Sequence, residues 1–197
     1  MNFLAHIYLS NNIENILIGN YIADAIKGNK YLNYPLEIQQ GIILHRAIDY
    51  FTDNHSITKK SKRRLHAQYG HYKGVIIDIF YDHFLAKNWN NYSTIPLEKY
   101  VDNVYSVLEK NRTILPEKIQ KILTSMIKYN WLVNYASLEG IEQVLIGMNN
   151  KSKGISKMNL AIEDLKINYT KFENDFLPFF KELIEFSNTK TTILQAL

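Results

Sequence analysis

Apolar residues recur every three or four positions along most of this chain, which is the spacing of amphipathic α-helices. Strict apolar–polar alternation and hairpin turn pairs, the signals of β-strands, are scarce. The pattern predicts helices near residues 11–28, 35–53, 56–69, 72–89, 96–112, 116–134, 138–150, 155–173 and 175–187. We therefore expect an all-α fold, a single-domain multi-helix bundle over residues 1–197, with functional residues mainly in 1–90 and scaffold helices in 91–197.

Residues with strong backbone preferences mark several of the expected helix ends. Ser10 suits the N-cap of the first helix, and Pro35 and Pro116 suit first turns. Gly28 and Gly70 would fit just beyond helix ends, where a left-handed backbone is common.

Composition narrows the class of protein. The chain has 197 residues, 46% of them hydrophobic, and no cysteine, which excludes disulfides, thiolate metal sites and a cysteine nucleophile. No run approaches the roughly 18 apolar residues of a membrane span, and the N-terminus lacks the basic segment of a signal peptide. We expect a cytoplasmic protein whose net charge of +4 favours an acidic partner or a phosphate-bearing substrate.

Acidic and imidazole side chains are concentrated near the N-terminus. All six histidines and five of the eight aspartates lie at or before position 83. In the first expected helix, Asp24 lies 11 residues after Ile13 and so returns to the face shared with Ile16 and Asn20. A carboxylate on that inward face needs a cation, a metal or several hydrogen-bond donors. A buried aspartate in a hydrogen bond or salt bridge is the structural alternative.

The second expected helix repeats this pattern. Ile42, His45, Asp49 and Asp53 follow one another at steps of three or four residues, so that His45 and Asp49 are neighbours on one face. An imidazole and a carboxylate one turn apart can hold a divalent metal or form a base with its orienting acid. A core histidine satisfied by its own carboxylate neighbour is the alternative. Arg46 projects elsewhere and could bind a phosphate or pair with an acid.

A third expected helix carries Asp78, Asp82 and His83 among apolar residues on nearly all sides, which indicates a central position. Together the three helices place acids and imidazoles on inward faces, which favours a metal site. Oxygen and nitrogen ligands without sulfur suit Mn²⁺, Mg²⁺ or Fe²⁺. His6 could bind the metal itself or donate a hydrogen bond to one of its ligands. His66 and His71 flank the pair Tyr69-Gly70, which is typical of a loop, and are expected at the surface.

One basic run stands out, formed by Lys59, Lys60, Lys62, Arg63 and Arg64. Such a run is usually a solvated helix face, although it could also dock an acidic protein. The aromatic residues that accompany basic ones in single-strand nucleic-acid binding are missing here, so we expect no nucleic-acid partner. Phosphate-loop, zinc-protease, serine-hydrolase and Rossmann motifs are absent as well.

Several blocks of sequence resemble the acyl carrier protein phosphodiesterases, also called ACP hydrolases. The blocks are MNFLAH at 1–6, GNYIADAIKG at 19–28, GIILHRAIDYFTDNH at 41–55, DIFYDHFLAKNW at 78–89 and, more weakly, WLVNYASLEGIEQVLIGM at 131–148. The resemblance implies an enzyme that removes the 4′-phosphopantetheine arm from holo-acyl carrier protein in fatty acid and lipid metabolism. It also implies a distant likeness to HD-domain phosphohydrolases and a divalent metal, with Mn²⁺ favoured.

The same resemblance implies the site residues. Asp24, Arg46 and Asp53 become the catalytic candidates, and the metal ligands are drawn from Asp24, His45, Asp49, Asp82 and His83. The adjacent pair reads Asp82-His83, the reverse of the HD signature. Because acyl carrier proteins are acidic, the run Lys59–Arg64 becomes the candidate docking surface. Two alternatives are an HD-like phosphohydrolase acting on a nucleotide or small phosphodiester, and a non-catalytic helical module that binds an acidic protein. The sequence leaves the oligomeric state open.

Overall fold

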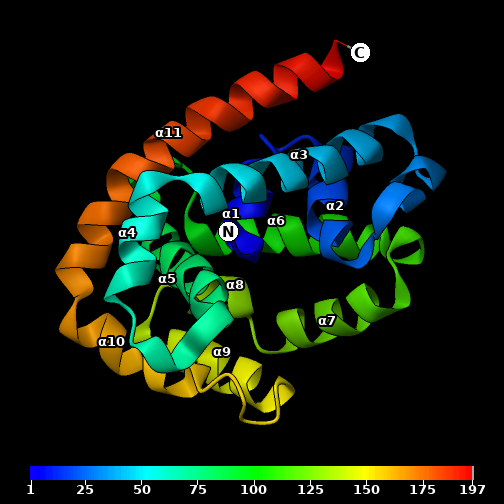
Figure 1. Cartoon of the computed structure of the whole chain (residues 1–197). Coiled ribbons are helices and arrows are strands. Elements are labelled where there is room, and N and C mark those ends of the chain that lie inside the picture. Colours follow the sequence, from blue (N-terminus) through cyan, green and yellow to red (C-terminus); the bar gives the residue numbers. More distant parts are fainter. Residues whose placement is uncertain (197) are drawn as a thin grey trace.

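A computed structural model describes residues 1–196, which contain helices and connecting turns but no strand (Figure 1). The α-helices are α1 (Phe3–Tyr8), α2 (Glu14–Ile22), α3 (Leu36–Asn54), α4 (Ser56–Arg64), α5 (Lys73–Lys87), α6 (Leu97–Lys110), α7 (Glu117–Lys128), α8 (Trp131–Asn134), α9 (Leu138–Lys151), α10 (Ala161–Ile167) and α11 (Tyr169–Gln195). Short 3-10 turns lie at η1 (Ala23–Ala25), η2 (Gly28–Asn33), η3 (Ala67–Tyr72), η4 (Trp89–Asn91), η5 (Arg112–Ile114) and η6 (Met158–Leu160). The prediction of an all-α fold is confirmed.

Four of the expected helices differ from those in the structure. The first begins at Glu14 after the N-cap Ile13, and it ends at Ile22, where η1 tightens the turn. The expected helix at 116–134 divides at Asn130, whose φ of +46° is incompatible with a continuous right-handed helix. The last two expected helices are replaced by α10 and a 27-residue α11, which runs through Pro178. Elsewhere Pro35 and Pro116 directly precede helices, as their missing N–H group allows.

Two glycines let α2 and α3 pack backbone against backbone. A Cβ atom on Gly19 would lie 2.2 Å from the carbonyl oxygen of Ile38, and one on Gly41 would lie 2.3 Å from that of Ile16. Real Cβ contacts are never this short, so any larger residue at either position would force the helices apart. This close approach places the residues that follow Gly19 directly beside the middle of α3.

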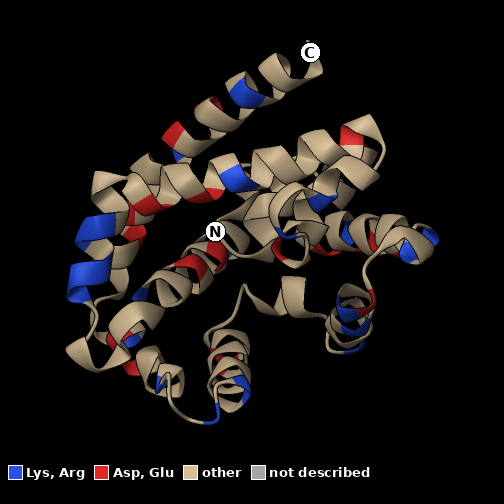
Figure 2. Cartoon of the chain, turned by 45° about the vertical axis from the view of Figure 1, so that its right-hand side comes forward, with Lys and Arg blue, Asp and Glu red and all other residues tan. Residues whose placement is uncertain are grey.

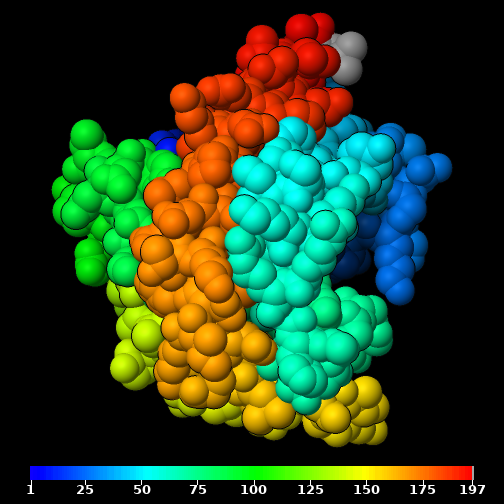
Figure 3. Space-filling model, turned by 60° about the vertical axis from the view of Figure 1, so that its left-hand side comes forward, coloured from blue at the N-terminus to red at the C-terminus, as the bar shows by residue number. Residues whose placement is uncertain are grey.

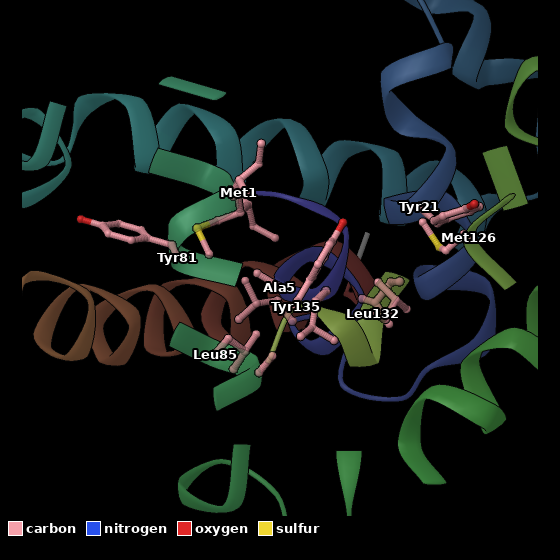
Figure 4. Packing of buried hydrophobic residues seen from close by; sticks show 14 of the residues in the cluster. Met1, Ala5, Tyr21, Tyr81, Leu85, Met126, Leu132 and Tyr135 are labelled. Atoms are coloured by element: carbon pink, nitrogen blue, oxygen red, sulfur yellow. The ribbon is translucent and has the colours of Figure 1, made fainter. Parts of the chain in front are cut away.

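A continuous hydrophobic core joins the N-terminal segment to the C-terminal half of the chain. Met1, Ala5, Leu85 and Tyr135 all belong to it and meet near its centre (Figure 4). The long helix α11 packs against α3, α4 and α5, and it covers one side of the molecule next to α4 (Figure 3). No helix within residues 1–196 combines the length and the apolar character needed to cross a membrane.

Candidate metal and active site

A cavity of about 1280 Å³ separates two groups of helices. Helices α3 and α5, with the N-terminal segment, form one wall, and α7, α8 and α9 form the other (Figure 1). The first wall is acidic, because Asp24, Asp49, Asp53 and Asp78 all line it. Figure 2 shows acidic residues on both sides of the N-terminus, and the opposite wall contributes lysines at 118, 121 and 151. These lysines were not among the predicted site residues.

His6, His45 and Asp49 form the one group within residues 1–196 whose ligand atoms are close enough to share a metal ion, all within 4.8 Å of one another. Nε2 of His6 lies 3.1 Å from Oδ1 of Asp49, and Nε2 of His45 lies 3.2 Å from Oδ2. The two imidazole rings stack with centroids 3.8 Å apart. Asp24 stands next to the group, with Oδ1 3.3 Å from Nε2 of His45.

The buried amide of Asn20 sets the orientation of both imidazoles. Its Nδ2 donates to the carbonyl oxygen of His6 at 2.7 Å and to Oγ of Ser10 at 3.0 Å. Its Oδ1 is therefore an acceptor, and it receives Nδ1–H of His6 at 2.9 Å and of His45 at 3.1 Å. Nδ1 of His45 also lies 2.8 Å from the backbone oxygen of Asn20, another obligate acceptor. Because both protons sit on Nδ1, each neutral ring directs a lone pair on Nε2 towards Asp49.

This donor set fits a divalent metal ion. The Nε2 lone pairs of His6 and His45 face carboxylate oxygens at 3.1–3.3 Å. Such lone pairs and carboxylates repel each other unless a proton or a metal cation lies between them. Within residues 1–196 no group makes a well-aligned hydrogen bond to Nε2 of His45, although the atom is buried. Imidazoles that bind metals characteristically donate their other N–H to a fixed acceptor, as both do here to Asn20.

Without a metal, a proton takes its place on one ring. Burial disfavours the charged form of His45, yet the carboxylates of Asp24 and Asp49, 3.3 and 3.2 Å from Nε2, raise its pKa to about 9. Burial and the neighbouring charge of His45 lower the pKa of His6 to about 4. Burial acts against the charge on Asp49, but the hydrogen bonds of both histidines hold the pKa of this carboxyl well below its usual range. The site therefore attracts positive charge.

The amino group of Met1 adds a buried cation to the acidic wall. It lies 3.2 Å from Oδ1 of Asp78 and 3.5 Å from Oδ1 of Asp49. Burial works against this ammonium group, but the carboxylates of Asp78, Asp49 and Asp82 raise its pKa to about 10. Burial raises the pKa of Asp78, although the ammonium group opposes this shift. These contacts hold the N-terminal segment against α3 and α5.

The structure places Asp82 and His83, two of the predicted metal ligands, outside the group of His6, His45 and Asp49. The carboxylate of Asp82 accepts hydrogen bonds from the backbone N–H groups of Asn2, Leu4 and Ala5, and so caps the N-terminus of α1. Nδ1 of His83 donates to the carbonyl oxygen of Tyr135 at 2.8 Å, and Nε2 accepts from the Tyr169 hydroxyl at 2.7 Å. With both ring nitrogens engaged, His83 has no free lone pair for a metal.

The catalytic candidates have three different environments. Asp24 is largely exposed on the cavity wall, and not on a buried stripe, because α2 ends before it and η1 changes the helical phase. Arg46 does not line the cavity, since its Nη2 donates to the carbonyl oxygens of Ile26 and Gly28 at 3.0 and 2.9 Å. It thereby holds the turn that follows Asp24. Asp53 lies on the cavity rim in an ion pair with Lys62 at 2.8 Å.

The basic run on α4 is only partly free for a partner. Lys60 and Arg64 both pair with the buried Asp175 of α11, and Lys62 pairs with Asp53. Lys59 and Arg63 are exposed and have no ion-pair partner among the described residues. His66 and His71 are exposed, as predicted.

Sequence reasoning left His6 undecided and did not identify Asn20 as a site residue. Asn20 shares a helical face with Ile16, so a buried amide among apolar residues was the available signal. Its partners His6 and His45 lie 14 and 25 residues away, which helical spacing alone cannot connect.

Comparison with known proteins identifies the family of the chain. The family model for acyl carrier protein phosphodiesterase matches residues 1–183. Proteins named acyl carrier protein phosphodiesterase from Photorhabdus laumondii and Pectobacterium atrosepticum are 31% and 29% identical to the chain. Each alignment covers 96% of this chain, together with 96% and 99% of the respective relative. No solved structure matches significantly. The chain belongs to the acyl carrier protein phosphodiesterase family.

Proposed function

We propose that this protein hydrolyses the phosphodiester that links 4′-phosphopantetheine to the serine of holo-acyl carrier protein, giving the apo form. Family membership and the names of the relatives support this activity. The observation that carries it in the structure is the convergence of His6, His45 and Asp49 at one wall of a large cavity. A reactive centre there can meet the phosphate while the cavity receives the attached arm.

The residues that would hold the metal are His6, His45 and Asp49, and Asp24 stands beside them. The proposed ion is Mn²⁺, because nitrogen and oxygen ligands without sulfur suit it. Mg²⁺ and Fe²⁺ are the alternatives. When bound, such an ion would acidify the attacking water and offset the charge of the phosphoryl oxygens. Asn20 would keep both imidazoles in the tautomer that presents Nε2 to the ion.

Asp24 is the best-placed general base on the cavity wall. Its carboxylate is 77% exposed, and the imidazole of His45 at 3.3 Å lowers its pKa, so it is ionised and open to a water molecule at neutral pH. In the proposed reaction it takes one proton from water as the new oxygen–phosphorus bond forms. The phosphorus–oxygen bond to serine breaks, and the serine oxygen gains a proton. Arg46 supports this step indirectly, because it fixes the turn that carries Asp24.

We also propose that the outer face of α4 binds the acidic carrier. Lys59 and Arg63 would provide the free charges, since the other three cations of the run are already paired. A Lys59→Glu/Arg63→Glu double variant should raise KM for the carrier and weaken its dependence on salt. Lys99→Glu/Lys110→Glu on α6 changes the net charge equally and serves as the control. Equal KM values for the two variants would contradict docking at α4.

Mass spectrometry of holo-carrier incubated with the protein and Mn²⁺ tests the central proposal. The expected product is a carrier that has lost the whole phosphopantetheine mass and has an unmodified serine. Unchanged holo-carrier, in a preparation that hydrolyses free nucleotides, would assign the site to a different phosphodiester. Unchanged carrier with no metal bound and no phosphodiesterase activity would contradict an enzymatic role.

A further inference from the structure

The cavity wall opposite the metal-binding residues has no role in the proposed reaction. Besides the lysines at 118, 121 and 151, it contains half-buried apolar side chains, namely Ile122 of α7, Trp131 of α8, and Val144 and Met148 of α9. Polar groups stand between them, since Asn134 and Gln143 line the same cavity. Side chains of this size and polarity are typical of a wall that binds an organic ligand, not one that binds only a phosphate.

Helix α9 is tightly packed at one end of this wall and open at the other. A Cβ atom on Gly140 would lie 1.9 Å from the carbonyl oxygen of Asn134, so α8 and α9 touch through their backbones there. Two turns further along, a Cβ atom on Gly147 would meet no atom within 4 Å, although Gly147 lines the cavity. Gly147 therefore adds no side chain to this stretch of the cavity wall, which also contains Val144 and Met148 and which we call the recess.

The chemistry of the recess matches the arm of the proposed substrate. A pantetheine arm is a flexible chain in which a branched apolar segment and two amides lead to a terminal thiol. The cavity, at about 1280 Å³, exceeds the roughly 300–1,000 Å³ of ordinary small-molecule sites. It therefore has room for the arm beyond the phosphate. The amides of Asn134 and Gln143 can bond the amides of the arm, and the apolar residues can cover its other segments.

We propose that the recess at Gly147 binds the thiol end of the pantetheine arm, and that the absence of a side chain there sets the length of arm that the protein accepts. This inference rests on the proposed function, because it assigns a position to the substrate of the same site.

A Gly147→Leu variant tests the recess. Leucine favours helix more than glycine and meets no neighbouring atom at its Cβ, so the variant should fold and melt at or above the wild-type temperature. Its side chain should fill the recess and raise KM for holo-carrier about tenfold, which corresponds to the loss of one good apolar contact. The increase should be larger for a carrier whose thiol carries an acyl chain. Hydrolysis of bis(4-nitrophenyl) phosphate, which has no arm, should stay within about twofold of wild type.

Two further variants act as controls. Gly147→Ala adds too little volume to fill the recess and should keep a KM near that of wild type. Asn150→Leu places the same side chain on α9 outside the cavity lining and should have no effect. A Gly147→Leu protein with wild-type KM for holo-carrier and acyl-carrier would overturn the inference and leave the proposed function intact. A wild-type protein that cleaves the small diester but never holo-carrier would instead overturn the proposed function, and the inference with it.

Discussion

The amide of Asn20 should control metal affinity without touching the metal. An Asn20→Ala substitution removes the acceptor of Nδ1–H of His6 and one of the two acceptors of Nδ1–H of His45. It also removes the amide N–H donor of the Ser10 hydroxyl and one of the two donors to the carbonyl oxygen of His6, which keeps the Ser10 hydroxyl at 2.9 Å. The imidazole of His6 is then free to adopt its other tautomer, which places a proton on Nε2 where the metal should bind.

The size of the effect follows from these contacts. Three hydrogen bonds are lost outright, and the fourth is partly replaced because His45 keeps the backbone oxygen of Asn20 at 2.8 Å. At about 1 kcal/mol per bond, the metal-free protein should lose roughly 3 kcal/mol of unfolding free energy. Loss of a group that orients metal-binding histidines should weaken Mn²⁺ binding about 10- to 100-fold.

Two variants separate orientation from general damage. Asn20→Asp keeps an oxygen for the two imidazoles but loses the amide donor, so it should be destabilised and still bind Mn²⁺ with near wild-type affinity. Asn15→Ala makes the same substitution on the same helix, where the amide bonds only the exposed Glu37, and should change neither quantity. Calorimetric titration with Mn²⁺ and urea unfolding in a chelator measure the two quantities. The tautomer argument is refuted if Asn20→Asp loses as much metal affinity as Asn20→Ala.

Three further outcomes are expected. Asp24→Asn should reduce the rate of arm release at least about 100-fold, which is the usual contribution of a general base. The variant should melt near the wild-type temperature because the side chain is exposed. A wild-type rate would remove Asp24 from the mechanism. His83→Gln should lower stability but keep Mn²⁺ affinity, since both ring nitrogens are bonded to Tyr135 and Tyr169; a loss beyond about tenfold would restore His83 as a ligand. Burial raises the pKa of Asp82 from 3.8 to about 7. Between these pH values the folded state keeps a proton on Asp82 that the unfolded state releases. The stability that this proton contributes is therefore lost as the pH rises from 3.8 to about 7. In chemical unfolding, the unfolding free energy of wild type minus that of Asp82→Asn should fall by roughly 3 kcal/mol from pH 4 to pH 7, and parallel pH profiles would contradict the shift.

Local geometry explains why part of the site could be predicted from sequence. His45 and Asp49 are four residues apart in one helix, so their proximity needs no information beyond helical periodicity. Helical periodicity gave the wrong position for Asp24, which was predicted on a buried helix face and lies exposed on the cavity wall. The prediction continued a regular helix past Ile22, whereas the chain there forms η1. For Asp82 and His83, periodicity could not indicate which groups they would bind. Inward direction was predicted for both, but a buried polar group can be satisfied by backbone as well as by metal.

The sequence by itself determined the helical class, the family and the i,i+4 histidine–aspartate pair, because these depend on local spacing and on matched blocks of residues. Only the tertiary structure decided that His6 joins His45 and Asp49 in the candidate metal site, that Asn20 bonds both imidazoles, and that α7, α8 and α9 face this site across a cavity. The physical reason is that helix crossings depend on contacts between distant segments. Gly19 and Gly41 let α2 and α3 touch, and Asp82 ties α1 to α5, and neither contact can be read from the periodicity of one helix.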